Sequence, residues 1–247
     1  MIKKIIFKDI IFSNFKDHQI HNLFEKKGLF VFPAGPGLSN IKVNSAYHLS
    51  LKKADFVFFD SGFFVLLLRI FKNIKVNKFS GYKFLKYFFK YISKNKKKSI
   101  LCIDPDKKNS DINNKLIKTL GVKKIFNYIA PNYAHGNYKD KKLLELVLSK
   151  KPDHILMNIA GGKQEILSFY LKKNLNFKTS IYCTGGAIAF FTGKQAPINK
   201  LIDDLYLGWF FRILFNPNIY LLRYLRAFKL FLIVLFSKVK VLKRFNR

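Results

Sequence analysis

Short apolar runs alternate with longer amphipathic segments between Gly28 and Cys183. Runs of roughly four to six apolar residues are typical of buried strands, and longer segments with apolar positions every three or four residues are typical of helices. The predicted strands are Gly28–Phe32, Asp55–Phe59, Ser99–Ile103, Lys123–Asn127, His154–Ile159 and Ser180–Cys183. The predicted helices are Ser39–Lys53, Phe63–Lys72, Tyr82–Lys94, Asn109–Leu120 and Lys139–Ser149. This alternation predicts an α/β, Rossmann-like fold with a mostly parallel sheet flanked by helices.

The pattern changes near Pro197, after which we predict only helices. Aromatic residues and leucines stand beside arginines there, and no acidic residue follows Asp204. An apolar face beside a cationic stripe suits a membrane surface, because the apolar side enters the acyl boundary and the cations meet lipid phosphates. We therefore predict an α/β core over residues 1–197 and an all-helical, basic, membrane-associating appendage over residues 198–247. The alternative is a helical hairpin packed on the core, with its basic side chains in water.

The net charge predicts an anionic partner. The 247 residues include 46 Lys plus Arg and 14 Asp plus Glu, a formal net charge of +32. Such a charge attracts nucleic acid, phosphorylated substrates and lipid surfaces. Part of it also matches the Lys, Phe, Ile and Asn bias that an AT-rich genome produces. No nucleic-acid-binding motif accompanies the charge, so we expect no nucleic acid partner.

Cysteine content and hydropathy favour a cytoplasmic chain without a spanning helix. Cys102 and Cys183 lie in apolar runs and are too few for a disulfide framework. The N-terminus lacks the uninterrupted apolar run of a signal peptide. The apolar segment Phe56–Phe71 contains Asp60 and Arg69, and Leu230–Phe236 is far shorter than the roughly 20 residues of a spanning helix.

Two glycine-containing turns follow predicted strands. His154–Ile159 runs into Ala160-Gly161-Gly162-Lys163-Gln164-Glu165, and Ser180–Cys183 runs into Thr184-Gly185-Gly186-Ala187. Glycine lets a ligand approach the backbone, and a helix N-terminus offers free N–H groups to a phosphate. Together the turns predict a site for a phosphorylated ligand at the carboxyl edge of the sheet. Each turn taken alone is more often an ordinary strand-to-helix connection.

Asp60 is the candidate catalytic carboxylate. It lies where the apolar run Phe56–Phe59 ends, and reacting groups of α/β folds gather at such strand ends. Apolar surroundings would raise the pKa of its carboxyl group and suit it to accept a proton from a hydroxyl nucleophile. Local sequence supports a second role at least as well, because Asp60 there can cap the helix that begins near Phe63.

We predict no metal site and no cofactor. Asp104-Pro105-Asp106 resembles the Asp-x-Asp with which sugar-nucleotide enzymes hold a divalent metal, but its composition is more typical of a turn and helix cap. Asp203-Asp204 is a weaker candidate, and the histidines lack metal-ligand spacing beyond His18-x-x-His21. The nucleophile elbow, the P-loop and the Gly-x-Gly-x-x-Gly fingerprint are also missing from the sequence, which argues against hydrolase, nucleoside triphosphatase and dinucleotide-binding functions.

Five motifs in order make the chain similar to a known family. They are the Asp60 turn, Arg69-Ile70-Phe71 with Phe79-Ser80-Gly81, the Gly-Lys-Gln-Glu turn, Thr184-Gly185-Gly186-Ala187 with Phe191-Thr192-Gly193-Lys194 and Ala196-Pro197, and Gly208-Trp209-Phe210-Phe211-Arg212 with Pro217. They resemble the WecG/TagA/CpsF family of bacterial glycosyltransferases over roughly Gly28 to Phe236. Each motif is loose, but five in the right order are hard to obtain by chance.

The resemblance implies an inverting, metal-independent transfer of an N-acetylmannosamine-type sugar from a UDP-sugar to a polyprenyl-diphosphate-linked acceptor, in cell-surface polysaccharide or teichoic acid assembly. It implies a peripheral protein on the anionic inner face of the cell membrane, and it leaves open whether the chain forms a homo-oligomer. Asp60 would be the base, and the remaining site residues would bind substrates. These substrate-binding residues are Gly162, Lys163, Gln164, Gly185, Gly186, Arg212, Arg223 and Arg226.

The chain departs from the family pattern at five places. They are Pro33-Ala34-Gly35 for Thr-x-Asn, Asp60-Ser61-Gly62 for Asp-Gly, Gly162 for proline, Ala189 for an acidic residue, and Asp104-Pro105-Asp106 for a glycine-rich turn. The first removes a hydroxyl and an amide expected near the acceptor or sugar. The departures keep open an alternative function, a catalytically silent lipid- or sugar-nucleotide-binding protein of the same fold.

Overall fold

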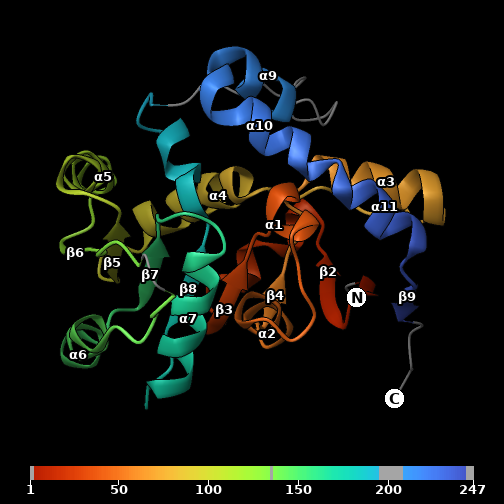
Figure 1. Cartoon of the computed structure of the whole chain (residues 1–247). Coiled ribbons are helices and arrows are strands. Elements are labelled where there is room, and N and C mark those ends of the chain that lie inside the picture. The colour runs from red at the N-terminus through yellow and green to blue at the C-terminus, as the bar shows by residue number, and fades with distance from the viewer. Residues whose placement is uncertain (1–2, 134–135, 195–207, 243–247) are drawn as a thin grey trace.

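A computed structural model describes residues 3–133, 136–194 and 208–242 (Figure 1). In these ranges nine strands form one sheet in the order β6-β5-β7-β8-β3-β4-β2-β1-β9. The strands are β1 (Lys3–Phe7), β2 (Ile10–Asn14), β3 (Gly28–Val31), β4 (Phe56–Val57), β5 (Ser99–Asp104), β6 (Lys124–Ile129), β7 (His154–Met157), β8 (Ser180–Cys183) and β9 (Val239–Leu242). Pairing is parallel from β6 to β2 and antiparallel around β1. The predicted mostly parallel α/β sheet is confirmed.

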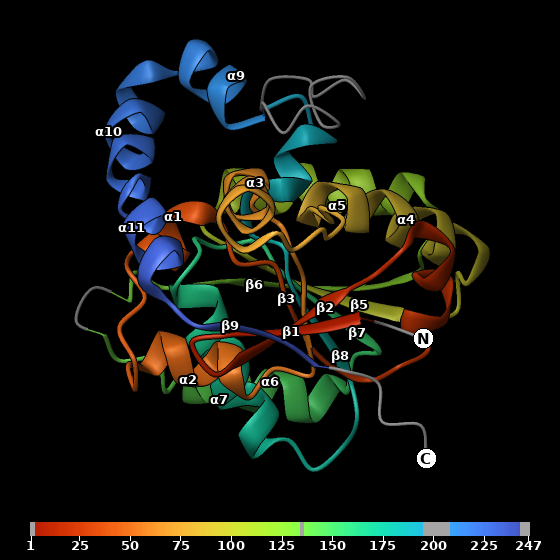
Figure 2. The ribbon, with the colours of Figure 1, turned by 90° about the vertical axis from the view of Figure 1, so that its right-hand side faces the viewer.

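Helices flank both faces of this sheet (Figure 2). Helices α2, α6 and α7 lie on one side, α4 and α5 lie on the other, and α3 contacts α11. The α-helices are α1 (Gly35–Ser39), α2 (Ala46–Lys52), α3 (Gly62–Lys72), α4 (Gly81–Lys94), α5 (Lys107–Thr119), α6 (Lys141–Lys150), α7 (Lys163–Asn174), α9 (Gly208–Phe215), α10 (Pro217–Ala227) and α11 (Lys229–Phe236). The 3-10 helices are η1 (Asp17–Gln19), η2 (His21–Leu23) and η3 (Gly185–Phe190).

The central strands are buried on both faces, which explains their continuous apolar sequences. Every residue of β5, β7 and β8 is buried. An aromatic layer lies between the middle of the sheet and α4, where Phe32 stacks on Phe58 with ring centroids 4.4 Å apart and Phe84 lies against Tyr182 at 4.9 Å. Close aromatic packing of this kind fixes the ends of β3 and β4 on the face of the sheet that α4 covers.

Two N-terminal elements differ from the prediction. The basic segment before Gly28 contains a hairpin, in which Lys8 and Asp9 form a two-residue turn with φ of 47° and 61° between β1 and β2. The helix predicted over Ser39–Lys53 forms only as the shorter α2, and α1 lies before it over Gly35–Ser39. Helix α2 begins at Ala46 because the Ser45 hydroxyl caps it by accepting the His48 N–H at 3.2 Å.

The C-terminal appendage is not all-helical, contrary to the prediction. After α9, α10 and α11 the chain forms β9, which pairs with β1 so that Val239 lies opposite Phe7. Without β9, strand β1 would be an edge strand with unpaired backbone N–H and C=O groups, and pairing with β9 satisfies them. Leu230 and Val234 of α11 are buried in the main core, and α10 and α11 lie against α1 (Figure 2). The appendage is therefore anchored at both α11 and β9.

Candidate active site at the carboxyl edge of the sheet

Asp60, Gln164 and Gly185 come from distant segments and meet at the carboxyl edge of the parallel strands. The Gly185 N–H donates to Gln164 Oε1 at 2.9 Å. The Gly81 N–H donates to Asp60 Oδ1 at 2.8 Å, and a Cβ atom on Gly81 would lie 3.4 Å from the carbonyl oxygen of Thr184. Gly81 therefore lies between Asp60 and the turn that begins at Thr184. The structure brings together the predicted base, the polar side chain and the second glycine turn.

Ser61, rather than Asp60, is the N-cap of α3. Its hydroxyl accepts the Phe64 N–H at 3.2 Å, whereas the Asp60 carboxylate accepts the N–H of Gly81 in the first turn of α4. A helix N-terminus stabilises nearby negative charge. The helix-cap alternative for Asp60 is therefore wrong, and its carboxylate is held between β4 and α4 at the edge of the sheet.

Gln164 and its neighbour Glu165 hold both glycine turns. Gln164 is buried, and its Nε2 donates to Glu165 Oε1 at 2.9 Å. The Gly162 N–H donates to Glu165 Oε2 at 2.6 Å. Two N–H groups that we expected to face a phosphate, those of Gly162 and Gly185, are thus engaged by side chains, which corrects that part of the prediction. Gln164 positions the Gly185 turn, and its contact with substrate stays a prediction.

Burial raises the pKa of Glu165 to about 7, and the charge of Asp60 adds to the increase. Hydrogen bonds from Gly162 and Gln164 act in the opposite direction because they stabilise the carboxylate. Desolvation dominates, since the Glu165 side chain is almost completely buried. Besides Asp60, the site therefore contains a buried carboxyl group, that of Glu165, whose pKa is raised toward neutral pH.

Substituting Glu165 by Gln is expected to flatten the pH dependence of stability. A raised carboxyl pKa contributes stability that is fully present below the unfolded-state value of 4.5 and is lost as the pH rises through about 7. The shift corresponds to roughly 3 kcal/mol. Urea unfolding between about pH 5 and pH 8 measures the difference between wild type and variant. Glu145→Gln, at an exposed position, is the matched control and should leave the pH dependence unchanged. Equal slopes of unfolding free energy against pH for wild type and Glu165→Gln would contradict the raised pKa of Glu165.

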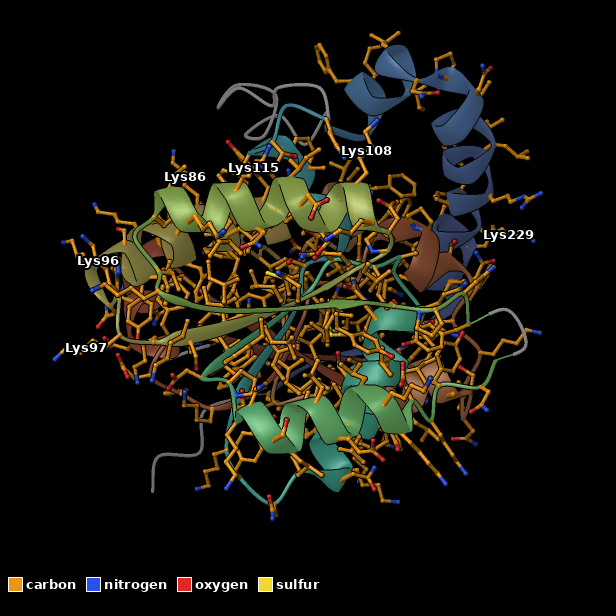
Figure 3. All side chains as sticks on the ribbon, turned by 90° about the vertical axis from the view of Figure 1, so that its left-hand side faces the viewer. Lys86, Lys96, Lys97, Lys108, Lys115 and Lys229 are labelled. Carbon is orange, nitrogen blue, oxygen red and sulfur yellow. The ribbon has the colours of Figure 1, made fainter. Side chains whose placement is uncertain are left out.

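Lysines supply positive charge at this edge. Lys163 Nζ donates to Asn132 Oδ1 at 3.3 Å, and Lys194 Nζ donates to Asn109 Oδ1 at 2.8 Å near the start of α5. Figure 3 shows Lys108 at the end of α5 nearer the C-terminal helices, whereas Lys86 projects outward from α4. Sequence reasoning missed Lys194, although it belongs to the Phe191-Thr192-Gly193-Lys194 motif.

The two aspartates of Asp104-Pro105-Asp106 have different environments. Asp106 is the N-cap of α5, where it accepts the Asn109 N–H at 2.8 Å, and Asp104 is buried and accepts Nδ2 of Asn113 at 2.7 Å and Nδ2 of Asn158 at 2.8 Å. Asp106 therefore has the helix-cap role weighed from the sequence. Within the described ranges, no group of three or more His, Cys, Asp and Glu residues could hold a metal ion.

The C-terminal helices carry a shallow, open apolar hollow of about 600 Å³ with a basic border. It is lined by Leu225, Arg226, Phe228, Lys229, Phe231 and Leu232. Arg226 is exposed, and Figure 3 shows Lys229 on the outside of the same helices.

The side chains of Arg212 and Arg223 lie outside the described residues, as do residues 195–207 with Asp203-Asp204. Helices in the described part of the chain are all too short or too polar to cross a bilayer.

A family model for the glycosyl transferase WecG/TagA/CpsF family matches residues 9–244. The chain belongs to this family. The WecG/TagA/CpsF match begins after β1 and includes β2, the carboxyl edge and the C-terminal helices, so nearly all of the described chain falls within one glycosyl transferase family. A search of curated proteins finds no significant match.

Two of the positions at which we expect a departure from the family pattern lie against each other. A Cβ atom on Gly35 would be 3.0 Å from the Ser61 hydroxyl oxygen. Glycine at position 35 therefore leaves room for the serine that caps α3. Gly162 and Gly185 have φ of +89° and +56°, a region that glycine adopts without strain. Ala189 and the exposed Gly186 both lie on η3.

Proposed function

We propose that the chain transfers an N-acetylmannosamine-type sugar from a UDP-sugar to a polyprenyl-diphosphate-linked acceptor, with inversion, in cell-surface polysaccharide assembly. The observation that carries the proposal is that the Asp60 edge and the basic, apolar C-terminal helices adjoin through α1. A water-soluble donor and a lipid-linked acceptor need a polar edge and a lipid-facing surface next to each other. The glycosyl transferase family supports the type of reaction.

Asp60 is the proposed general base. Its carboxylate takes the proton of the acceptor hydroxyl while the acceptor oxygen forms a bond to the anomeric carbon. The bond from that carbon to the phosphate oxygen breaks, and UDP leaves with the electron pair. Attack opposite the leaving group inverts the anomeric configuration. The Gly81 N–H supports this role because it holds the carboxylate in one orientation.

The proposed stabilisers of the departing UDP are cationic side chains. The N–H groups of Gly162 and Gly185 are engaged by Glu165 and Gln164, so we assign the diphosphate to lysines at the edge and arginines of the C-terminal helices. Charge-assisted hydrogen bonds to phosphate are roughly twice as strong as neutral ones. The cations that we assign to UDP are Lys163 and Lys194 at the edge and Arg212 and Arg223 on the C-terminal helices.

The lipid-linked acceptor is assigned to the C-terminal helices, which would rest on the anionic inner face of the cell membrane. The hollow between Leu225 and Leu232 offers apolar surface to a polyprenyl chain. Arg226 and Lys229 border it and would meet phosphates. This arrangement would place the acceptor diphosphate near α1 and so near the carboxyl edge.

Release of UDP from UDP-N-acetylmannosamine tests the proposal. We expect release that requires both the donor and a polyprenyl-diphosphate-linked acceptor. A catalytically silent protein would bind anionic vesicles or the nucleotide without releasing UDP. Absence of turnover with an acceptor-loaded vesicle, in a preparation that binds both substrates, would favour that alternative.

A further inference from the structure

We propose that Asp104, Asn158 and Thr184 form a subsite for neighbouring hydroxyl groups of the donor, on either its ribose or its sugar. The proposal deepens the proposed function, because it takes the ligand to be a sugar nucleotide. It assigns a binding role to the ends of β5, β7 and β8, beside the segment Asp104-Pro105-Asp106.

The three residues extend three neighbouring strands on the same face of the sheet. Strand β5 pairs with β7, and β7 pairs with β8. Each of the three lies two positions beyond a buried residue of the cluster under α4 and α5, and side chains two positions apart in an extended strand share a face. The pairs are Cys102 and Asp104, Leu156 and Asn158, and Tyr182 and Thr184.

Each residue presents a buried polar atom without a hydrogen-bond partner in the described part of the chain. Asp104, Asn158 and Thr184 are 0%, 6% and 8% exposed. The unpartnered atoms are Asp104 Oδ2, Asn158 Oδ1 and Thr184 Oγ1, although the Ser110 hydroxyl also lies near the Asp104 carboxylate. Two further atoms of this kind, Asn114 Oδ1 and His154 Nε2, belong to other parts of the described chain. Buried polar atoms in native proteins are nearly always hydrogen-bonded, so three on adjacent strand ends indicate a ligand that supplies the missing partners.

The arrangement of hydrogen bonds specifies what the ligand must offer. Asn113 and Asn158 donate their Nδ2 groups to Asp104 Oδ1 at 2.7 Å and 2.8 Å. These donations fix the carboxylate and leave its second oxygen, with the amide oxygen of Asn158, as acceptors. Such a pair repels a phosphate and accepts O–H or N–H groups. An acidic residue at a sheet edge that binds ribose hydroxyls is an established solution in nucleotide-binding α/β folds.

The subsite adjoins the proposed reaction centre. Thr184 directly precedes Gly185, whose N–H is held by Gln164, and it contacts Gly81, which holds Asp60. On the other side, α5 begins shortly after Asp104. A donor bound here would lie along the edge, with its hydroxyls at β5 and β7 and its reacting carbon toward β4.

Calorimetric titration of the full chain tests the subsite. One pair of ligands is UDP and 2′-deoxy-UDP, and the other is a UDP-hexose and its deoxyhexose analogue. Asp104→Asn retains the oxygen that Asn113 and Asn158 contact but replaces the unpartnered acceptor by an NH₂ donor. We expect wild type to bind the hydroxylated probe about tenfold more tightly than its deoxy analogue. In Asp104→Asn this ratio should fall to about one. The UDP pair reports on the ribose and the hexose pair reports on the sugar.

Thr184→Val and Asp106→Asn complete the design, with thermal melting as the check of folding. Thr184→Val keeps the side-chain shape and should also lower the ratio, so the test does not depend on Asp104→Asn folding. Asp106→Asn changes the exposed helix cap and should keep the wild-type ratio. Unchanged ratios in both Asp104→Asn and Thr184→Val would overturn the subsite.

The same titration separates the subsite from the proposed function. If wild type releases UDP but discriminates against neither deoxy analogue, the subsite is wrong and the transferase proposal stands. If another ribonucleoside diphosphate binds in place of UDP and loses its hydroxyl discrimination in Asp104→Asn, the subsite stands and the UDP donor is wrong. Binding of no nucleotide by folded wild type would overturn both.

Discussion

Replacing Asp60 by Asn is expected to lower the rate of UDP release by about 10²- to 10⁴-fold, the contribution typical of one positioned base. The asparagine oxygen can still accept the Gly81 N–H that Asp60 Oδ1 accepts at 2.8 Å, so the β4–α4 connection should stay intact. The amide cannot take the proton of the acceptor hydroxyl. Steady-state kinetics of UDP release measure kcat, and calorimetry should show that UDP binding changes little.

Asp55→Asn is the matched control for this substitution. Asp55 precedes β4 at its amino end, where its carboxylate accepts the Leu29 N–H at 2.7 Å and pairs with Lys172 at 2.7 Å. Its replacement should reduce stability without a comparable loss of rate. A near-normal rate in Asp60→Asn would remove the base role from Asp60.

Glu165 is the other carboxyl group in the site, and its contacts indicate positioning rather than proton transfer. Both of its oxygens accept hydrogen bonds, from Gly162 and from Gln164. It is almost completely buried behind these groups. If Asp60→Asn kept its rate while Glu165→Gln lost it, the assignment of the two carboxylates would have to be exchanged.

The sequence predicts the central sheet well because its strands are short apolar runs that end at turn residues. It also predicts that Asp60, Gln164 and Gly185 meet, since all three follow strands and parallel strands end at one edge. The hairpin at Lys8 and Asp9 escapes such reasoning because it lacks the glycine that normally marks a two-residue turn. Strand β9 escapes it because its pairing with β1 joins opposite ends of the chain.

Glycine alone overstates the evidence for phosphate binding. Gly162 and Gly185 adopt positive φ, so the backbone conformation already accounts for glycine at both positions. Their N–H groups are satisfied by Glu165 and Gln164 through contacts that depend on the folded arrangement of α7 and β8. A sequence pattern shows neither contact. Five buried side-chain atoms in the described part of the chain lack a hydrogen-bond partner, and three of them, on Asp104, Asn158 and Thr184, lie at this edge of the sheet.

Substituting Leu225, Leu232 and Phe236 together by serine is expected to weaken binding to anionic vesicles by about a hundredfold or more, because each side chain is already partly buried. These side chains are 53%, 54% and 81% exposed, and full burial of each in an apolar phase contributes roughly 1.5 to 3 kcal/mol. Truncation of the appendage would be a poorer test, because Leu230 and Val234 are buried in the core and β9 pairs with β1. The triple variant leaves these anchors in place.

Co-sedimentation with vesicles measures this effect, and Leu49→Ser on the distant helix α2 is the control for loss of an exposed apolar side chain. UDP release with a short-chain, water-soluble acceptor should be close to that of wild type, whereas release with a vesicle-bound acceptor should fall with vesicle binding. That divergence would separate membrane docking from catalysis, because the substituted residues lie on α10 and α11 and the proposed base lies between β4 and α4. Unchanged vesicle binding would mean that the apolar side of these helices faces something other than lipid.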